Sequence, residues 1–188
     1  MKPGFADPVF GAQEGFSALM NAMAHPGRIQ DCAVLRDLPA GLEPAAAAAL
    51  LTLADAETPL WTDAQDAARD WIAFHTGAPF VDVAHAQFLL ATRGMPRLAK
   101  LNQGSDETPQ ESATLILQLP HLDDAKGWHL TGPGIEHEHR LAAQGLPADF
   151  PAQWAANRAQ FPRGVDLILC AGTRLAALPR TTRLAEHS

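Results

Sequence analysis

The sequence has no tyrosine, three lysines and two cysteines, and none of its apolar runs is long. Cys32 and Cys170 are far apart and form no CxxC motif, which predicts two buried free thiols in a reducing cytosol instead of a disulfide framework. The longest apolar run, Ala45–Leu53, is far shorter than the roughly 20 residues that cross a bilayer. The first eight residues lack the apolar centre of a secretory signal. We therefore expect a soluble, cytoplasmic protein with no membrane contact.

Positive charge is also scarce, since the 188-residue chain has a formal net charge of −7. This excess of acid argues against a general nucleic-acid binder, because phosphate contacts need clustered lysine and arginine. A content of 47% hydrophobic and 19% charged residues excludes a disordered chain. The length is that of one compact domain with its own core, so we expect residues 1–188 to form a single domain.

Several segments predict helices. Phe16, Leu19, Met20 and Met23 follow the spacing of an amphipathic helix, which Pro26-Gly27 would end. Pro44, at a first-turn position, predicts a second helix over 45–54. Two more are predicted over 63–74, with Thr62 as the N-cap, and over 151–160.

Short apolar runs bounded by glycine, proline and charged residues predict strands. They lie at 29–35, 88–90, 113–119, 128–130 and 165–170. The longer runs lack strict alternation, which is typical of strands covered on both faces. Residues 175–178 would pair with 165–170 across the turn 172–174. The sequence therefore predicts an α/β fold with three layers, α/β/α, and a mixed sheet.

Two motifs point to ligands. On a strand, His137 and His139 would share one face and could bind zinc, but no third ligand is evident. Their charged neighbours favour a solvated edge, so we expect no metal site. Gly132 and Gly134 follow a strand, where backbone N–H groups could hold a phosphate. A turn that needs positive φ explains both glycines equally well.

Polar residues at the ends of apolar elements form a possible cleft. Asp166 lies within an apolar strand and needs a partner, either Arg163 or Arg180, for structure or around an anionic ligand. No nucleophile motif is present, so we assign no catalytic residue. The candidate ligand-binding or interface residues are Asp55, Glu57, Thr58, His75, Gly132, Gly134, Asp166 and Arg180.

Seven short motifs, taken in order, resemble the PhnH family, the H subunit of the bacterial carbon–phosphorus lyase core complex. Examples are Phe74-His75-Thr76-x-Ala78-Pro79 and Pro179-Arg180-Thr181-Thr182. The motifs lie at 16–27, 50–61, 74–79, 113–118, 130–135, 161–169 and 179–182. Each is weak alone, but seven in one order are highly specific, and they extend over nearly the whole chain.

The resemblance implies a vestigial form of the pyridoxal-phosphate-dependent transferase fold, a homodimer, and assembly with the G, I and J subunits. The complex breaks down alkylphosphonates as a phosphorus source. In it, the H subunit would support transfer of methylphosphonate to ribose C1 of MgATP, which displaces adenine and forms ribose 1-methylphosphonate 5-triphosphate. The resemblance implies the I subunit as the seat of the nucleosidase chemistry and the radical-SAM J subunit as the one that cuts the C–P bond.

Two further functions remain open from the residues themselves. One is a stand-alone small-molecule enzyme that uses His75 or the pair His137 and His139. The other is a dimeric protein whose cleft binds a phosphorylated ribose intermediate. Pyridoxal phosphate needs a buried Schiff-base lysine. Lys2 is terminal, while Lys100 and Lys126 lie in polar stretches, so we expect no cofactor.

Overall fold

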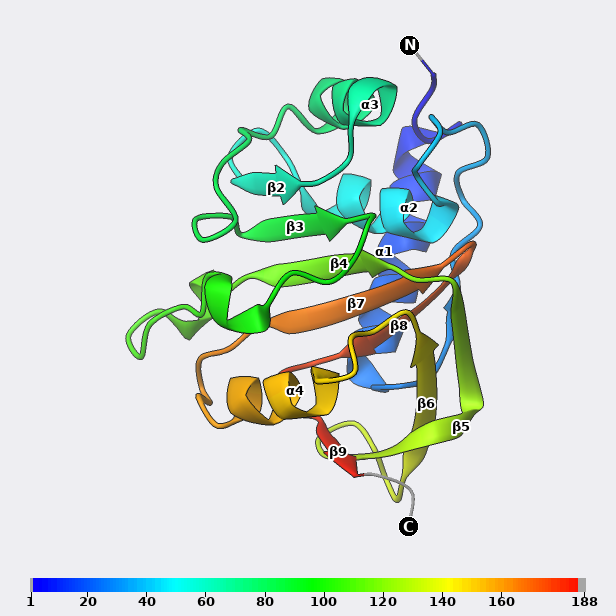
Figure 1. Cartoon of the computed structure of the whole chain (residues 1–188). Helices are drawn as coiled ribbons and strands as arrows, with labels where there is room; N and C mark the ends of the chain where they lie inside the picture. Colours follow the sequence, from blue (N-terminus) through cyan, green and yellow to red (C-terminus); the bar gives the residue numbers. More distant parts are fainter. Residues whose placement is uncertain (1, 186–188) are drawn as a thin grey trace.

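The computed structural model describes residues 2–185 and is built on a six-stranded sheet (Figure 1). The order across the sheet is β1 (Gln30–Asp31), β8 (Arg174–Leu178), β7 (Asp166–Ala171), β4 (Thr114–Gln118), β3 (Phe88–Ala91) and β2 (Leu60–Thr62). In this sheet β2, β3, β4 and β7 run parallel, whereas β8 is antiparallel to both of its neighbours, β7 and β1. The predicted mixed sheet and the predicted pairing of 175–178 with 165–170 are confirmed.

Both faces of this sheet are covered, which explains the unbroken apolar runs. In β4, Ile116 packs in the cluster beneath α1, α2 and α3, while Leu115 and Leu117 pack in the cluster on the opposite face. Successive side chains of a strand point to opposite faces. A strand buried on both sides therefore needs an apolar residue at every position.

Three helices cover the first face: α1 (Pro8–Ala24), α2 (Pro44–Leu53) and α3 (Asp66–Thr76). The alanines 45–49 of α2 are fully buried, and their small side chains let the helix lie close to the sheet. Gly15 lets α1 lie close to α2, since a Cβ there would lie 2.7 Å from Thr52 Oγ1. α1 begins earlier than the residue spacing predicted, because the Asp7 carboxylate accepts hydrogen bonds from the N–H groups of Val9 and Phe10.

The second face is covered by α4 (Phe150–Arg158) together with a separate sheet (Figure 1). That antiparallel sheet has the order β6 (His139–Gln144), β5 (His121–Thr131) and β9 (Arg183–Ala185). The run at 128–130 thus lies in β5 and outside the main sheet. Only Leu119 and Pro120 separate β5 from β4, too short a link for a parallel crossover. The outer layer is consequently mixed, not helical alone as predicted.

Two element ends also differ from the sequence prediction. The strand expected at 29–35 is only Gln30–Asp31. Thr62 is not a helix cap but belongs to β2, where its hydroxyl donates to Leu90 O at 2.9 Å and accepts from Ala64 N–H at 3.0 Å. α3 starts at Asp66, three residues later than predicted, with Gln65 as its N-cap. Among residues 2–185 no helix combines the length and the apolar content needed to cross a membrane.

Candidate functional site

The polar residues predicted to line one cleft lie in three separate places. Asp55, Glu57 and Thr58 close the turn between α2 and β2. Asp55 Oδ1 accepts from Glu57 N–H at 2.9 Å, and the Thr58 hydroxyl bonds to both the N–H and the carbonyl of Asp55. His75, at the end of α3, has its Nε2 3.0 Å from Lys2 O and anchors the N-terminal segment. These four residues have structural partners and do not converge with Asp166.

Asp166 and Arg180 form a well-buried pair in which each side chain is about one-seventh exposed (14% and 15%). Arg180 Nε lies 3.1 Å from Oδ1 and Nη2 lies 2.5 Å from Oδ2, a bidentate arrangement. The Arg180 backbone N–H also donates to Oδ1, and Nη1 donates to Pro109 O. Of the two arginines considered, the structure selects Arg180, whereas Arg163 pairs with Asp106 at 3.2 Å.

Gly132 and Gly134 shape the loop that follows β5. Gly134 has a φ of +81°, and a Cβ there would lie 2.2 Å from Ala24 O at the end of α1. Gly132 has a φ of +133°, and a Cβ there would lie 3.1 Å from Thr181 O. The positive-φ explanation therefore holds for both glycines, but Gly132 in addition lines a cavity.

That cavity brings Gly132 and Arg180 together. Its volume is about 300 Å³, and its other lining residues are Pro133, Arg158, Phe161, Thr181 and Arg183. Sequence reasoning did not single out Arg158 or Arg183. The only signal for Arg158 was its place in the last turn of a predicted helix, where a cation suits the helix dipole. Among residues 2–185, the lining of this cavity brings together three guanidinium groups and no carboxylate.

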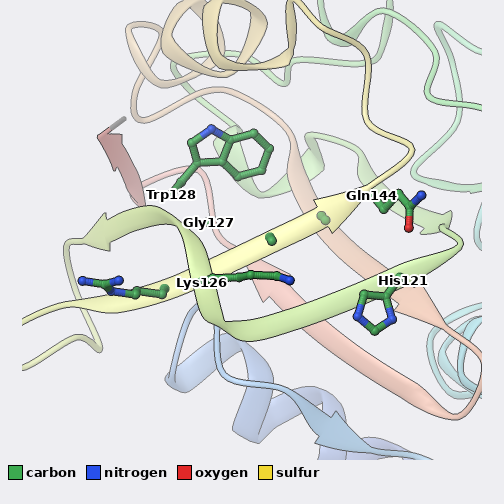
Figure 2. A pocket seen from close by; sticks show the side chains of 8 residues that line it. His121, Lys126, Gly127, Trp128 and Gln144 are labelled. Carbon is green, nitrogen blue, oxygen red and sulfur yellow. The ribbon is translucent and has the colours of Figure 1, made fainter. Parts of the chain in front are cut away.

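A larger cavity, of about 680 Å³, lies where β5 bulges away from β6 (Figure 2). The pairing register skips residues 124–127. Gly127 has a φ of +102°, and a Cβ there would lie 2.2 Å from Leu141 O. Only glycine lets β5 cross β6 this closely, so the shape of the cavity follows from Gly127.

The charged groups of this larger cavity are solvated. Lys126 extends into the space between β5 and β6 (Figure 2), but its Nζ lies 3.3 Å from Asp123 Oδ2 and its side chain is 71% exposed. A hydrogen bond from Ala125 N–H, with help from Lys126, lowers the pKa of Asp123 below its ordinary value. An exposed ion pair of this kind contributes little energy. We therefore assign no chemistry to this cavity.

The two histidines considered for zinc have other roles. His139 has both ring nitrogens occupied, since Nδ1 lies 2.6 Å from Pro26 O and Nε2 accepts from Arg28 Nε at 3.1 Å. His137 precedes β6 and is exposed beside Glu136. Over residues 2–185, no three or more histidine, cysteine, aspartate or glutamate side chains form a group suited to a metal ion.

Both cysteines are buried free thiols. Burial raises the pKa of Cys32 to about 11 and that of Cys170 well above its ordinary range, and the nearby acidic side chains Glu14 and Glu43 add to these effects. Thiolate is the reactive form of cysteine. Both thiols are thus held in the unreactive, protonated form near neutral pH.

We expect these thiols to react slowly with an aromatic disulfide reagent at pH 8 and to react fully, at two per chain, after unfolding in urea. The raised pKa of Cys32 also contributes stability below pH 9, and that contribution is lost as the pH rises toward 11. Thiol release followed against time measures the first effect. Rapid reaction of either thiol in the folded protein would contradict the burial.

Comparisons with known proteins confirm the resemblance to the PhnH family. The family model for bacterial phosphonate metabolism protein (PhnH) matches residues 3–185. A Rhizobium meliloti (strain 1021) protein named alpha-D-ribose 1-methylphosphonate 5-triphosphate synthase subunit PhnH is 41% identical, with 97% of this chain and 94% of the relative aligned. HtxG of Stutzerimonas stutzeri, provisionally named a C-P lyase subunit protein, is 34% identical over 92% of this chain and 85% of its own length. The chain belongs to the PhnH family of bacterial phosphonate metabolism proteins.

Proposed function

We propose that the chain is an accessory subunit of the carbon–phosphorus lyase assembly and supports formation of ribose 1-methylphosphonate 5-triphosphate from MgATP and methylphosphonate. The observation that carries this proposal is the 41% identity, over 97% of the chain, with a relative named as a subunit of that synthase. The partners would be the G, I and J subunits, and the location the cytoplasm.

The chemistry of the described residues supports an accessory role over a catalytic one. The best-organised charged pair, Asp166 and Arg180, is satisfied by its own hydrogen bonds. Cys32 and Cys170 are buried and protonated. His75 and His139 are engaged with backbone carbonyls. A stand-alone enzyme would need a nucleophile beside a free base, and residues 2–185 hold none of these groups in that arrangement.

We also propose that the fold descends from pyridoxal-phosphate-dependent transferases and has lost the cofactor. Lys2 pairs with Asp37 at 2.8 Å, and Lys100 and Lys126 are exposed. A Schiff-base lysine has to be desolvated to act as a nucleophile at neutral pH. None of the three lysines meets that condition, which supports a protein that works without pyridoxal phosphate.

The outer face of α1 supports the proposed homodimer. Phe16 and Met20 share the amphipathic spacing of this helix with Leu19 and Met23, but they are 53% and 52% exposed. Val9 and Phe10 are exposed on the same helix, at 64% and 70%. An apolar patch on one helix is typical of an interaction surface, and a symmetric dimer buries the same patch on both chains.

We expect the isolated protein to sediment as a dimer at micromolar concentration and the Phe16→Asp variant to sediment as a monomer. A carboxylate at the centre of an apolar interface loses its hydration without gaining a partner. Phe74→Asp is the matched control, because Phe74 is an exposed phenylalanine (67%) on α3. Monomeric sedimentation of the unmodified protein would contradict the proposal.

The accessory role is tested by deleting the gene from its own bacterium and supplying methylphosphonate as the phosphorus source. Growth should stop on methylphosphonate and continue on inorganic phosphate. The wild-type gene should restore growth, and a tagged copy should retain the G, I and J subunits. Unchanged growth of the deletion strain on methylphosphonate would overturn the proposal.

A further inference from the structure

The cavity beside Gly132 gathers positive charge in a chain whose net charge is −7. Arg158 comes from the last turn of α4, Arg180 from the turn after β8, and Arg183 from the start of β9. Arg180 and Arg183 are close in sequence, whereas Arg158 comes from a separate element, α4, which contacts β9. The cavity lies where these elements meet. Three like charges repel one another at this range. Their convergence therefore needs an explanation.

One of the three charges is balanced within the fold. Arg180 directs Nε and Nη2 at the Asp166 carboxylate, and its Nη1 donates to carbonyl oxygens. Within residues 2–185, Arg158 and Arg183 form no side-chain hydrogen bond and no ion pair. Arg158 Nε is, moreover, shielded from solvent without an acceptor. A buried donor without a partner costs about 1–3 kcal/mol. Two guanidinium groups that have no acidic partner among residues 2–185 thus line the cavity.

Neutral groups on the other wall fit the same kind of ligand. Thr181 lines the cavity, and its side chain forms no hydrogen bond with another residue of the 2–185 range. A Cβ added at Gly132 would lie 3.1 Å from Thr181 O, so a side chain at this position would crowd the backbone at Thr181, which also lines the cavity. The cavity is thus lined by charged guanidinium donors, a threonine and a short backbone loop.

We propose that this cavity binds a phosphoryl or phosphonyl group of a small organic molecule, with Arg158 and Arg183 as its charged ligands and Arg180 held in place by Asp166. Two free guanidinium charges match a tetrahedral dianion, and the planar guanidinium group holds two of its oxygens at once. The volume of about 300 Å³ admits one such group with a small substituent.

The organic part of the ligand would lie over Phe161. This ring is 64% exposed and lines both the arginine cavity and a neighbouring one of about 340 Å³. The neighbouring cavity has apolar walls that include Met23 and Pro179. A phosphorylated or phosphonylated ligand can therefore place its charge on the arginines and its carbon skeleton against an apolar surface. The inference does not depend on assembly with other subunits.

Calorimetric titration of the isolated chain tests the site with ribose 5-phosphate, methylphosphonate, inorganic phosphate and acetate as probes. We expect one tetrahedral dianion bound per chain and at least tenfold weaker binding of acetate. The strongest binder among the first three probes identifies whether an ester, a phosphonate or the free ion is preferred. Absence of binding heat for all three at millimolar concentration would overturn the inference.

Substitutions of the arginines test whether the anion binds in this cavity. Arg183→Gln should weaken binding tenfold or more, and because Arg183 is exposed the variant should fold normally. Arg158→Gln should have a similar effect. Arg36→Gln is the matched control, since Arg36 is an exposed arginine elsewhere, and its affinity should stay within twofold of wild type. If Arg183→Gln binds the anion as tightly as wild type, this cavity is not the binding site. That result would leave the proposed assembly with the G, I and J subunits unaffected.

Discussion

Replacing Arg180 by lysine is expected to lower the free energy of unfolding by about 3 kcal/mol, and the melting temperature by roughly 6–12 °C for a chain of this size. Lysine keeps the charge but cannot make two parallel bonds to the Asp166 carboxylate or reach Pro109 O. Because the pair is only about one-seventh exposed, the carboxylate would be left poorly satisfied. Thermal unfolding followed by circular dichroism measures the effect.

The matched control is Arg36→Lys at an exposed arginine, which should melt like wild type. A variant Arg180→Lys that melts normally but fails to support growth on methylphosphonate would assign Arg180 to ligand or partner binding instead of structure. If the variant melts like wild type and also supports normal growth, Arg180 is needed neither for stability nor for binding, and its proposed role beside the arginine cavity is wrong.

Replacing Gly134 by alanine is expected to destabilise the protein by roughly 3 kcal/mol, from left-handed strain and from displacement of packed backbone. Its φ is +81°, and the new Cβ would lie 2.2 Å from Ala24 O and 3.0 Å from Pro26 Cδ. Neither neighbour is the flexible end of a side chain. The loop after β5 would have to move away from the end of α1, and urea unfolding would show an earlier midpoint.

The Gly41→Ala variant separates the cost of left-handed backbone strain from the cost of displacing packed backbone. Gly41 has a φ of +89°, but a Cβ there meets nothing within 4 Å. It should therefore cost only the conformational strain, about 1 kcal/mol. If Gly134→Ala costs no more than Gly41→Ala and instead weakens anion binding, Gly134 holds a ligand through its backbone and the packing role is wrong.

Local sequence patterns were sufficient to predict the elements at the centre of the fold. Pro44 and the alanine run predicted α2, and the apolar runs at 113–119 and 165–170 predicted strands β4 and β7, which the structure places side by side. The turn at 172–174 predicted the antiparallel pair β7 and β8. Each of these signals is contained within one short segment, so no knowledge of distant contacts was needed.

The second sheet could not be predicted in the same way. In β5, residues 124–127 (Asp-Ala-Lys-Gly) bulge out of the pairing with β6 and interrupt the apolar pattern of a strand. β6 carries alanine, arginine and glutamine, whereas β-branched residues are typical of strands. The amphipathic pattern of α1 was misleading for a related reason. Phe16 and Met20 obey helical spacing, but that spacing does not say which apolar face meets the sheet.

The candidate site was predicted only in part. Asp166 required a partner because it lies in an apolar strand, and Arg180 was one of the two arginines considered. Asp55, Glu57, Thr58 and His75 were grouped because each ends an element, yet each bonds locally or to the N-terminal segment. Arg158 and Arg183 were missed because their cavity forms only when α4, β9 and the loop after β5 meet.

Reconstitution of the synthase reaction tests the central claim most directly. The G and I subunits, together with the ATPase-like partner that the family resemblance also implies, would be incubated with MgATP and methylphosphonate, with and without this chain. Phosphorus NMR would follow the reaction. We predict that ribose 1-methylphosphonate 5-triphosphate and free adenine accumulate only when the chain is present. Equal product formation in its absence would contradict its role as a subunit that the synthase requires.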